Sequence, residues 1–248
     1  MSRSVIFITG GNSGIGLATA LKFAASGCDV SLLSRREAEN ERARSQVEEH
    51  GVRCVTFAGD VGRAEDVAAA VDQTCRELGR LDYAFNNAGI DQQHSSLISQ
   101  TEDDYQEIMD TNVKGVWLCM QQQIPRMLEA GGGVIVNTGS VASLVGSPRM
   151  PLYVASKHAV LGMTRAVALE YAAKNIRVNA VCPAVVETPM FRRFVDAKPE
   201  VEQTAKVLHP MGRLGTAEEI ASTVYWLCTE ASWTTGQSIT VDGGFTAM

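Results

Sequence analysis

Short apolar runs alternate with longer helical segments along the chain, and this alternation constrains the fold more than any other feature. Seven runs are near-continuously apolar, as in strands that are buried on both faces of a sheet. They cover residues 4–9, 29–34, 53–58, 81–86, 134–138, 177–182 and 238–241. Segments with a helical pattern begin near residues 14, 37, 64, 101, 152 and 216. This pattern predicts the α/β class, with a doubly wound parallel sheet of seven strands and helices on both faces.

The composition favours one domain that spans residues 1–248. Hydrophobic residues make up 45% of the chain, and no stretch of linker composition divides it. Lys and Arg number 22 against 28 Asp and Glu, which gives a net charge of −6. This acidic balance argues against nucleic acid as a partner, because a nucleic-acid surface needs a concentrated basic stripe.

The apolar runs and the cysteines indicate where in the cell the protein is expected to be. No apolar run of the sequence approaches the ~20 residues of a membrane span, so we expect no membrane association. The strand-like run at residues 5–8 begins almost at the first residue, which argues against a cleavable leader. Six cysteines are scattered without a Cys-x-x-Cys pair or a histidine cluster. They are interpreted as buried, reduced thiols of a cytoplasmic protein, with no disulfide framework and no metal site.

A glycine-rich segment follows the first apolar run and opens the first helical segment. Its sequence, Thr-Gly-Gly-Asn-Ser-Gly-Ile-Gly at residues 9–16, has the spacing Gly-x-x-x-Gly-x-Gly. Glycines permit a tight turn close to a pyrophosphate, and the helix offers free N–H groups and a positive dipole end. An ordinary glycine-rich turn is the alternative. The interpretation as a dinucleotide site on a Rossmann-like fold names Gly10, Asn12, Ser13, Gly14, Ile15 and Gly16.

Further motifs stand at the predicted ends of strands. Asn-Asn-Ala-Gly at residues 86–89 closes the fourth run, Ser140 follows the fifth, and Tyr153-x-x-x-Lys157 opens a long helical segment. With the glycine-rich segment and with the stretches 176–183 and 239–244, these motifs resemble the short-chain dehydrogenase/reductase family. The resemblance covers essentially the whole chain. It implies hydride transfer between a nicotinamide cofactor and a small-molecule secondary alcohol or ketone.

Tyr153 and Lys157 are four residues apart, so their side chains leave the same face of a helix. A free tyrosine has a pKa of ~10. A nearby ammonium group stabilises the phenolate and lowers that pKa, which suits a general acid/base near neutral pH. We predict that Tyr153 exchanges the proton on the substrate oxygen and that Lys157 lowers the pKa of Tyr153. Taken alone, such a pair is more often part of a solvated helix face.

The resemblance implies two more catalytic residues. Ser140 would hold the substrate oxygen by a hydrogen bond while charge develops on it. Asn112 matches the position that holds a water linking the lysine to solvent. Taken alone, Ser140 could be a turn former and Asn112 a helix-breaking amide. The complete set favours an enzyme over a catalytically silent, cofactor-sensing protein of the same fold.

The end of the second apolar run bears on the choice of cofactor. A carboxylate there would bind the adenosine ribose of NAD(H), but Ser34 and Arg35 stand in its place. A hydroxyl and a guanidinium group suit a 2′-phosphate, so the sequence favours NADP(H). NAD(H) stays open, because the glycine-rich segment has no basic residue. An exposed charge at the start of a helix is the alternative role of Arg35.

By the same resemblance, further residues would contact the cofactor around its adenine, ribose and nicotinamide. They are Asp60, Val61, Asn87, Ala88, Gly89, Tyr153, Lys157, Pro183, Val186 and Thr188. Ala184 stands where the family usually has glycine. If that position needs a positive φ, alanine costs about 1 kcal/mol and the loop beside the nicotinamide is shifted.

Residues 90–96, 141–152 and 190–211 are candidate walls of a substrate pocket. Their large side chains are mostly apolar, which predicts an apolar or cyclic alcohol or ketone. They include Leu144, Val145, Met150, Leu152, Met190, Phe191 and Phe194. A 3-oxoacyl thioester and a sugar of the glucose type are alternative substrates. If Arg192, Arg193 and Lys198 turned inward, they would favour an acidic substrate.

Two expectations concern motion and assembly. Residues 190–212 interrupt the strand–helix rhythm and carry charge at both ends, so we expect them to form a mobile lid. Relatives in the family are commonly tetramers, which makes a homotetramer the expected assembly. Small residues at 155, 159, 162 and 166 would permit close helix contact, although the same residues could pack on the sheet.

Overall fold

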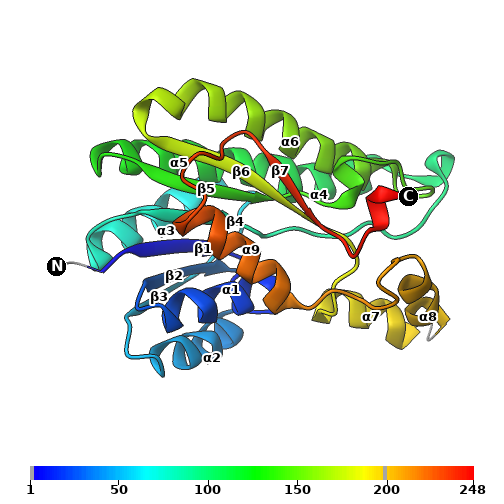
Figure 1. Ribbon diagram of the computed structural model, residues 1–248, viewed down its shortest axis with the longest axis horizontal. Helices are drawn as coiled ribbons and strands as arrows, with labels where there is room; N and C mark the ends of the chain where they lie inside the picture. The colour runs from blue at the N-terminus through cyan, green and yellow to red at the C-terminus, as the bar shows by residue number, and fades with distance from the viewer. Residues whose placement is uncertain (1–2, 198–199) are drawn as a thin grey trace.

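The seven predicted strands form one all-parallel sheet. The computed structural model describes residues 3–197 and 200–248. Within these ranges the strands lie in the order β3-β2-β1-β4-β5-β6-β7 (Figure 1). Their bounds are β1 Val5–Thr9, β2 Asp29–Ser34, β3 Cys54–Ala58, β4 Tyr83–Asn86, β5 Gly133–Thr138, β6 Ile176–Pro183 and β7 Ser238–Val241. The predicted runs are confirmed, with differences of one or two residues at some ends.

Helices cover both faces of the sheet (Figure 1). One face carries α1 (Gly14–Ala25), α2 (Glu37–Glu48) and α9 (Ala217–Thr229). The other carries α3 (Ala64–Leu78), α5 (Gly115–Glu129) and α6 (Pro151–Tyr171). Beyond the carboxyl ends of the strands lie α7 (Pro189–Ala197) and α8 (Glu200–Val207). The predicted doubly wound α/β class is confirmed.

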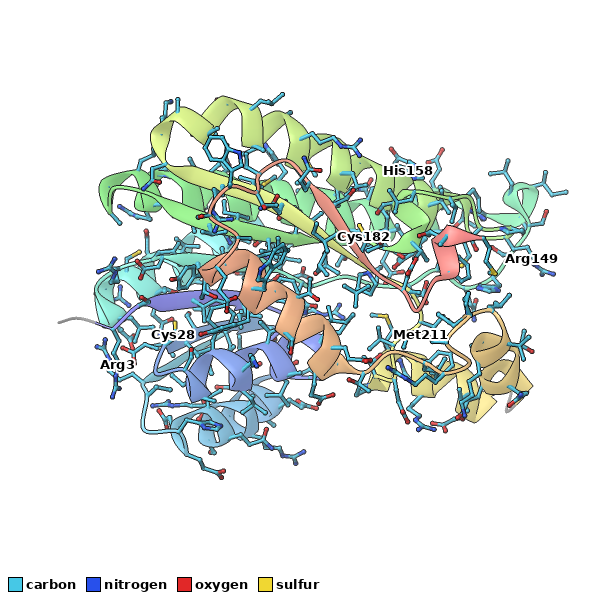
Figure 2. All side chains as sticks on the ribbon, in the orientation of Figure 1. Arg3, Cys28, Arg149, His158, Cys182 and Met211 are labelled. Carbon is cyan, nitrogen blue, oxygen red and sulfur yellow. The ribbon has the colours of Figure 1, made fainter. Side chains whose placement is uncertain are left out.

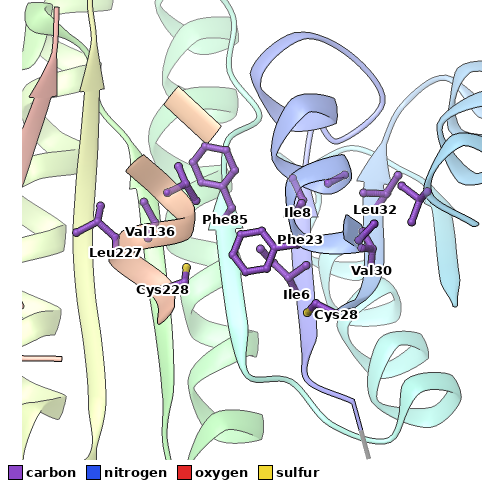
Figure 3. Packing of buried hydrophobic residues seen from close by; sticks show 14 of the residues in the cluster. Ile6, Ile8, Phe23, Cys28, Val30, Leu32, Phe85, Val136, Leu227 and Cys228 are labelled. Atoms are coloured by element: carbon purple, nitrogen blue, oxygen red, sulfur yellow. The ribbon is translucent and has the colours of Figure 1, made fainter. Parts of the chain in front are cut away.

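The core lies on both sides of the central strands. Ile6 and Ile8 of β1 are fully buried and belong to one apolar cluster with Phe23 of α1 and Leu227 of α9 (Figure 3). Phe7 lies between them in sequence and belongs to the cluster on the opposite face. Successive strand residues point to opposite faces, and burying each large side chain contributes roughly 1.5–3 kcal/mol. This two-sided burial explains why the strands read as continuous apolar runs.

The helical segment that begins near residue 101 is divided in two. Thr101 caps α4 (Glu102–Met109): its hydroxyl accepts from Asp104 N at 3.1 Å, and the Asp104 carboxylate accepts from Thr101 N at 2.8 Å. A π-helical turn, Asp110–Lys114, then joins α4 to α5. Such turns are rare and often occur at functional sites. This one contains Asn112, one of the predicted catalytic residues.

A capping box opens α9. The Thr216 hydroxyl accepts from Glu219 N at 3.3 Å, and the Glu219 carboxylate accepts from Thr216 N at 2.9 Å. Arg213 forms an ion pair with Glu219 at 2.7 Å. The hydrogen bonds of Arg213 and Thr216 lower the pKa of Glu219 to about 2. This cap fixes where α9 begins, directly after the segment that closes on the site.

Cysteines and membrane spans can be compared with the sequence-based expectations. The six cysteines are free; five are buried, as predicted, while Cys75 on α3 is only half-buried. In the two described ranges, no helix has both the length and the apolar character that a membrane crossing requires. Within the same ranges, no three His, Cys, Asp or Glu side chains gather as a metal site would need.

Candidate active site

Two loops meet where the strand order reverses. β1 lies between β2 and β4, so the connections after β1 and after β4 leave toward opposite sides of the sheet. Ligands of doubly wound folds bind in the crevice that this reversal creates. Thr9 Oγ1 accepts hydrogen bonds from the backbone N–H of Asn87 at 3.0 Å and of Ala88 at 2.9 Å. These bonds join the glycine-rich segment to the loop after β4.

The glycine-rich segment has the open backbone that a pyrophosphate site needs. Gly10 and Gly14 have φ values of 64° and 52°, where side chains are strained. A Cβ on Gly16 would collide with the carbonyl oxygen of Gly10. Ser13 is the N-cap of α1, yet its hydroxyl caps no helical N–H, so the first turn keeps free donors. The segment therefore fits a dinucleotide, with its phosphates at the N-terminus of α1.

Two amides of the predicted cofactor site hold the loops themselves. Asn87 Nδ2 donates to Thr9 O at 3.0 Å and to Gly10 O at 3.3 Å. Asn12 Nδ2 donates to Asn40 Oδ1 of α2 at 2.9 Å. Both amides thus shape the walls of the crevice. Neither side chain needs to touch a cofactor for this role.

The end of β2 offers a hydroxyl and a cation without partners. Ser34 is buried, and its Oγ has no hydrogen-bond partner within the described ranges. Arg35 is exposed and forms no ion pair with any described residue. Its neighbour Arg36 pairs with Glu39 at 3.3 Å. An unused hydroxyl beside an unpaired guanidinium group fits an anion at this position.

Asp60 and Val61 follow β3 and line the far end of the crevice. Asp60 Oδ1 accepts from Gly62 N at 2.9 Å, and Asp60 N donates to Asp66 Oδ2 at 2.9 Å. These bonds fix the turn, while Asp60 Oδ2 has no partner in the described part of the chain. Val61 is buried. The free carboxylate oxygen is the group that the sequence assigned to the adenine amine.

The predicted catalytic pair lies on the first turns of α6. Lys157 is buried, and its Nζ donates to Thr138 O, at the end of β5, at 2.9 Å. The same nitrogen lies 5.6 Å from the centroid of the Tyr153 ring. Tyr153 itself is only partly buried. The β5 strand end therefore sets the position of the lysine, and the lysine lies against the tyrosine.

The ionisation of this pair differs from the prediction. Burial and the Asp91 carboxylate raise the pKa of Tyr153, and a hydrogen bond with Ser140 offsets only part of that rise. Burial lowers the pKa of Lys157 to about 8. The prediction that Lys157 lowers the pKa of Tyr153 is therefore wrong for the protein alone. Its ammonium group faces the ring and the Thr138 carbonyl, so burial dominates.

Ser140 stands at the end of β5 and contacts Tyr153. It is the N-cap of a short 3-10 turn, Val141–Ser143, and its Oγ accepts from Ala142 N at 3.2 Å. Its backbone N–H donates to Ser143 Oγ at 3.0 Å. Ser140 also lowers the pKa of the Tyr153 hydroxyl, although burial raises that pKa by more. Two local bonds thus hold a serine that acts on the ionisation of the tyrosine.

The side chain of Asn112 is fully used within the protein. Its Oδ1 accepts from Ile90 N at 2.8 Å, and its Nδ2 donates to Ile90 O at 3.0 Å and to Ser156 Oγ at 3.2 Å. Gly89 lies between this amide and the lysine: a Cβ there would be 3.2 Å from Asn112 Oδ1 and 3.6 Å from Lys157 Nζ. Asn112 therefore ties α6 to the loop after β4, beside the lysine.

The segment after β6 closes over the glycine-rich segment. Val186 forms an isolated parallel bridge with Gly215. Gly215 N donates to Val185 O at 3.1 Å and Glu187 N donates to Gly215 O at 2.9 Å, so Val186 turns its own N–H the other way. The methyl group of Thr188 lies opposite Gly14, where a Cβ would be 3.3 Å away. Thr188 and the Val186 segment thus lie against the glycine-rich segment, and their contacts with a nicotinamide stay a prediction.

The expected strain at Ala184 is absent. Among the described residues, Arg149 and Asn175 are the non-glycine residues with positive φ. Ala184 therefore has an ordinary backbone, and its N–H donates to the O atom of Val241, the last residue of β7, at 3.4 Å. Pro183, just before it, is the last residue of β6. Alanine costs nothing here because the position requires no left-handed conformation.

The three predicted pocket walls differ in exposure. Met150 is buried, whereas Leu144 and Val145 are 39% and 38% exposed, so large apolar side chains face solvent beside the catalytic pair. Met190 and Phe191 are half-buried. Lys198 and the side chain of Phe194 lie outside the described residues. The described walls therefore keep apolar surface open next to Ser140 and Tyr153.

The basic residues of the 190–212 segment do not gather in the pocket. Arg192 forms ion pairs with Glu187 and with Glu202, the latter at 3.5 Å. Lys206 pairs with Glu202 at 2.7 Å. Arg193 is exposed and acts on the pocket residue Asp91, whose pKa it lowers. Arg192 and Lys206 are thus paired with carboxylates, whereas Arg193 keeps a positive charge beside the substrate side of the site.

Sequence reasoning missed a buried polar network under the site. Asn86 Nδ2 donates to Gln123 Oε1 at 3.2 Å and to Asn137 Oδ1 at 2.9 Å, and Asn137 Nδ2 donates to Thr164 Oγ1 at 3.0 Å. The network joins β4, α5, β5 and α6. Amides at the ends of two otherwise apolar strands were the available signal. Satisfied networks of this kind fix one arrangement of a core.

Comparisons with known proteins identify the family of this chain. A family model described as "Enoyl-(Acyl carrier protein) reductase" matches residues 10–246. The chain is 42% identical over 250 residues to a 2,5-dichloro-2,5-cyclohexadiene-1,4-diol dehydrogenase of Sphingobium indicum, covering 100% of this chain and 99% of the relative. It is 37% identical over 247 residues to a cyclohexanol dehydrogenase of an Acinetobacter species, covering 99% and 96%.

Two solved structures with a bound cofactor are also similar. A structure of ElxO with NADP bound has a TM-score of 0.92 and 32% identity, covering 99% of this chain and 100% of that one. A structure of NAD+-bound xylitol dehydrogenase has a TM-score of 0.93 and 33% identity, covering 97% and 98%. The chain belongs to the short-chain dehydrogenase/reductase family. It is an NAD(P)-dependent oxidoreductase that acts on secondary alcohols and ketones.

Proposed function

We propose that this enzyme interconverts an apolar or cyclic secondary alcohol and its ketone, with Tyr153 as the general acid/base. The observation that carries the proposal is the convergence of Ser140, Tyr153 and Lys157 at the edge of the crevice that the glycine-rich segment borders. The family membership supports the same chemistry. When bound, the nicotinamide supplies the hydride chemistry.

The residues of this chain divide the proton chemistry between them. Ser140 binds the substrate oxygen, and Tyr153 exchanges its proton with that oxygen. Because the pKa of Tyr153 is raised, the hydroxyl is protonated at neutral pH and suits ketone reduction there. Lys157 and Asn112 lie on two sides of Gly89, which suits a path for the proton toward solvent.

We propose NADP(H) as the preferred cofactor. The unpartnered Ser34 hydroxyl and the unpaired Arg35 guanidinium group support a 2′-phosphate at the end of β2. Among similar structures, one holds NADP and another NAD+, so the family accommodates both. The adenine would lie toward Asp60 and Val61, and the nicotinamide toward Pro183, Val186 and Thr188. Tyr153 and Lys157 would lie against the ribose next to it.

The substrate class rests on the pocket walls and on the relatives. Apolar side chains at residues 144, 145, 150, 190 and 191 suit a hydrophobic ring. Two of the most similar relatives are named for cyclic alcohols. A 3-oxoacyl thioester is the second candidate, because the matching family model carries the description of an acyl-carrier-protein reductase. We further propose that residues 190–212 form a lid over the substrate site. Equal protease sensitivity with and without cofactor would count against this proposal.

We also propose a homotetramer in the cytoplasm. Ala155, Gly162 and Ala166 of α6 are exposed, so they are free for contact with another copy and do not pack on the sheet. Leu169 on the same helix is 82% exposed. Six free thiols suit a reducing compartment. Size-exclusion chromatography with light scattering tests the assembly.

A substrate panel tests the proposed function. Purified enzyme is incubated with NADP+ or NAD+ and with cyclohexanol, a linear secondary alcohol or glucose, and reduced nicotinamide is followed by absorbance. The reverse reaction is measured with cyclohexanone and a 3-oxoacyl thioester. The proposal expects turnover of the cyclic compounds, faster with NADP(H). Turnover of the thioester or of glucose alone would favour the alternative substrate classes.

A further inference from the structure

The loop after β4 is fastened to the start of the catalytic helix. Gln92 Oε1 accepts from Tyr153 N at 3.0 Å, and Ser95 N donates to Arg149 O at 3.1 Å. Figure 2 shows Arg149 near the end of the molecule where the strands terminate. Arg149 has a φ of 66°, an uncommon value for a side-chain-bearing residue. The loop and the segment before α6 therefore hold each other beside Tyr153.

Gln92 accepts a hydrogen bond from the first turn of α6, where the helix has no cap of its own. The first N–H groups of a helix lack partners within it. The N-cap residue of α6 is Met150, whose side chain makes no cap hydrogen bond, and Pro151 has no N–H. The amide oxygen of Gln92 supplies the missing acceptor at Tyr153 N. This bond also fixes the orientation of the amide, because the reverse orientation would place two donors against each other.

The other end of the same amide is unused. Gln92 is 4% exposed, and its Nε2 has no hydrogen-bond partner among the described residues. A buried amide N–H without an acceptor is costly, and native structures rarely leave one so. The Gln92 Oε1 bond holds this donor next to the first turn of α6. The donor is therefore fixed in position, and no described protein group accepts from it.

The residue before Gln92 carries an acceptor without a donor. The half-buried Asp91 carboxylate accepts from Gln92 N at 2.8 Å through Oδ1, and no described residue donates to Oδ2. Its charged neighbours are Lys157 on α6, His94 in the same loop and Arg193 on α7, and within the described ranges none of them forms an ion pair with it. Asp91 directly precedes Gln92, which is bonded to Tyr153 N, and its carboxylate raises the pKa of Tyr153.

We propose that Asp91 and Gln92 form a subsite for a second hydroxyl group of the substrate, next to the carbon that Tyr153 and Ser140 serve. A hydroxyl both donates and accepts, so it can donate to Asp91 Oδ2 and accept from Gln92 Nε2. A carbonyl offers only acceptors and an apolar ring offers neither. The substrate class is thus a cyclic diol or hydroxyketone. This inference rests on the proposed function, because it names the substrate of the same site.

Selectivity between a diol and a monoalcohol tests the subsite. Values of kcat/KM are measured for cyclohexanol and for the 1,2-, 1,3- and 1,4-cyclohexanediols with wild type, Gln92→Met and Asp91→Asn. The wild type is expected to prefer at least one diol over cyclohexanol. Each variant should lower that preference about 10-fold, because a buried hydrogen bond to the second hydroxyl is lost. Asp91→Asn keeps the oxygen that Gln92 N bonds and guards against misfolding of the other variant.

The ratio of kcat/KM for a diol to that for cyclohexanol, here called the preference, separates the subsite from a purely structural role. The absolute rate does not. If Gln92 only caps α6, Gln92→Met lowers the rates for all four alcohols equally and the preference stays at the wild-type value. An unchanged preference in both variants, or a wild type that prefers none of the diols, overturns the subsite. Asp103→Asn, an exposed change on α4, is the matched control and should keep the preference. If the wild type turns over no alcohol, the proposed function fails together with the subsite.

Discussion

The cofactor side and the substrate side of the crevice are held together by different kinds of contact. On the cofactor side, the glycine-rich segment and the ends of β2 and β3 are short turns that follow directly from buried strands, and Thr9 binds the turn that ends β4. On the substrate side, the long loop after β4 is held by bonds to the start of α6: Gln92 to Tyr153 and Ser95 to Arg149. Local turns give a rigid phosphate site, whereas long connections allow the pocket to vary while the chemistry stays the same.

The largest expected effect lies at the point where the two sides meet. Tyr153→Phe removes the hydroxyl that exchanges the proton, so kcat should fall about 10²- to 10⁴-fold. Cofactor affinity, measured by fluorescence titration, should change little, because the glycine-rich segment is untouched. Substantial turnover by this variant would show that Tyr153 is not the general acid/base. The cofactor side and the substrate side would then not meet at this residue.

A change on the cofactor side should alter only the choice of cofactor. Arg35→Ala removes the unpaired cation, and the ratio of kcat/KM for NADP+ to that for NAD+ should fall about 10- to 100-fold. Arg36→Ala is the matched control, since Arg36 is adjacent but already paired with Glu39. Equal ratios in both variants would mean that Arg35, at the end of β2, does not bind the 2′-phosphate.

A change on the substrate side should move the pH dependence. The Asp91 carboxylate raises the pKa of Tyr153, so Asp91→Asn should lower that pKa. Alcohol oxidation requires the deprotonated phenol and increases as pH rises through this pKa. The variant's kcat should therefore increase at lower pH than that of the wild type, as measured by initial rates across a pH series. An unshifted profile would show that Asp91 lies too far from Tyr153 to matter.

The smallest effect concerns stability alone. Thr216→Ala removes the side-chain cap of α9, and the free energy of unfolding in urea should fall by about 1 kcal/mol. Ser222→Ala, on an exposed turn of the same helix, should change it by less. If the two variants lost equal stability, the cap at Thr216 would not anchor the segment that closes over the site.

The sequence predicted the cofactor side better than the substrate side, for a physical reason. Apolar runs and glycines are local signals, and they located the strands and the segment at residues 10–16. Contacts between residues that are far apart in the sequence leave no such local signal, so they could not be predicted. Burial of Tyr153 against Asp91 reversed its predicted pKa shift, and the strain expected at Ala184 did not occur. Gln92 gave no signal at all, because its role depends on Tyr153, which is 61 residues away in sequence.

The decisive assay follows the appearance of reduced nicotinamide when the purified wild type is mixed with a cyclic secondary alcohol and each cofactor. We expect turnover with both cofactors, faster with NADP+ than with NAD+. Tyr153→Phe should lose this turnover while still binding NADP+. Wild-type enzyme that binds NADP+ but oxidises no alcohol and reduces no ketone would contradict this expectation.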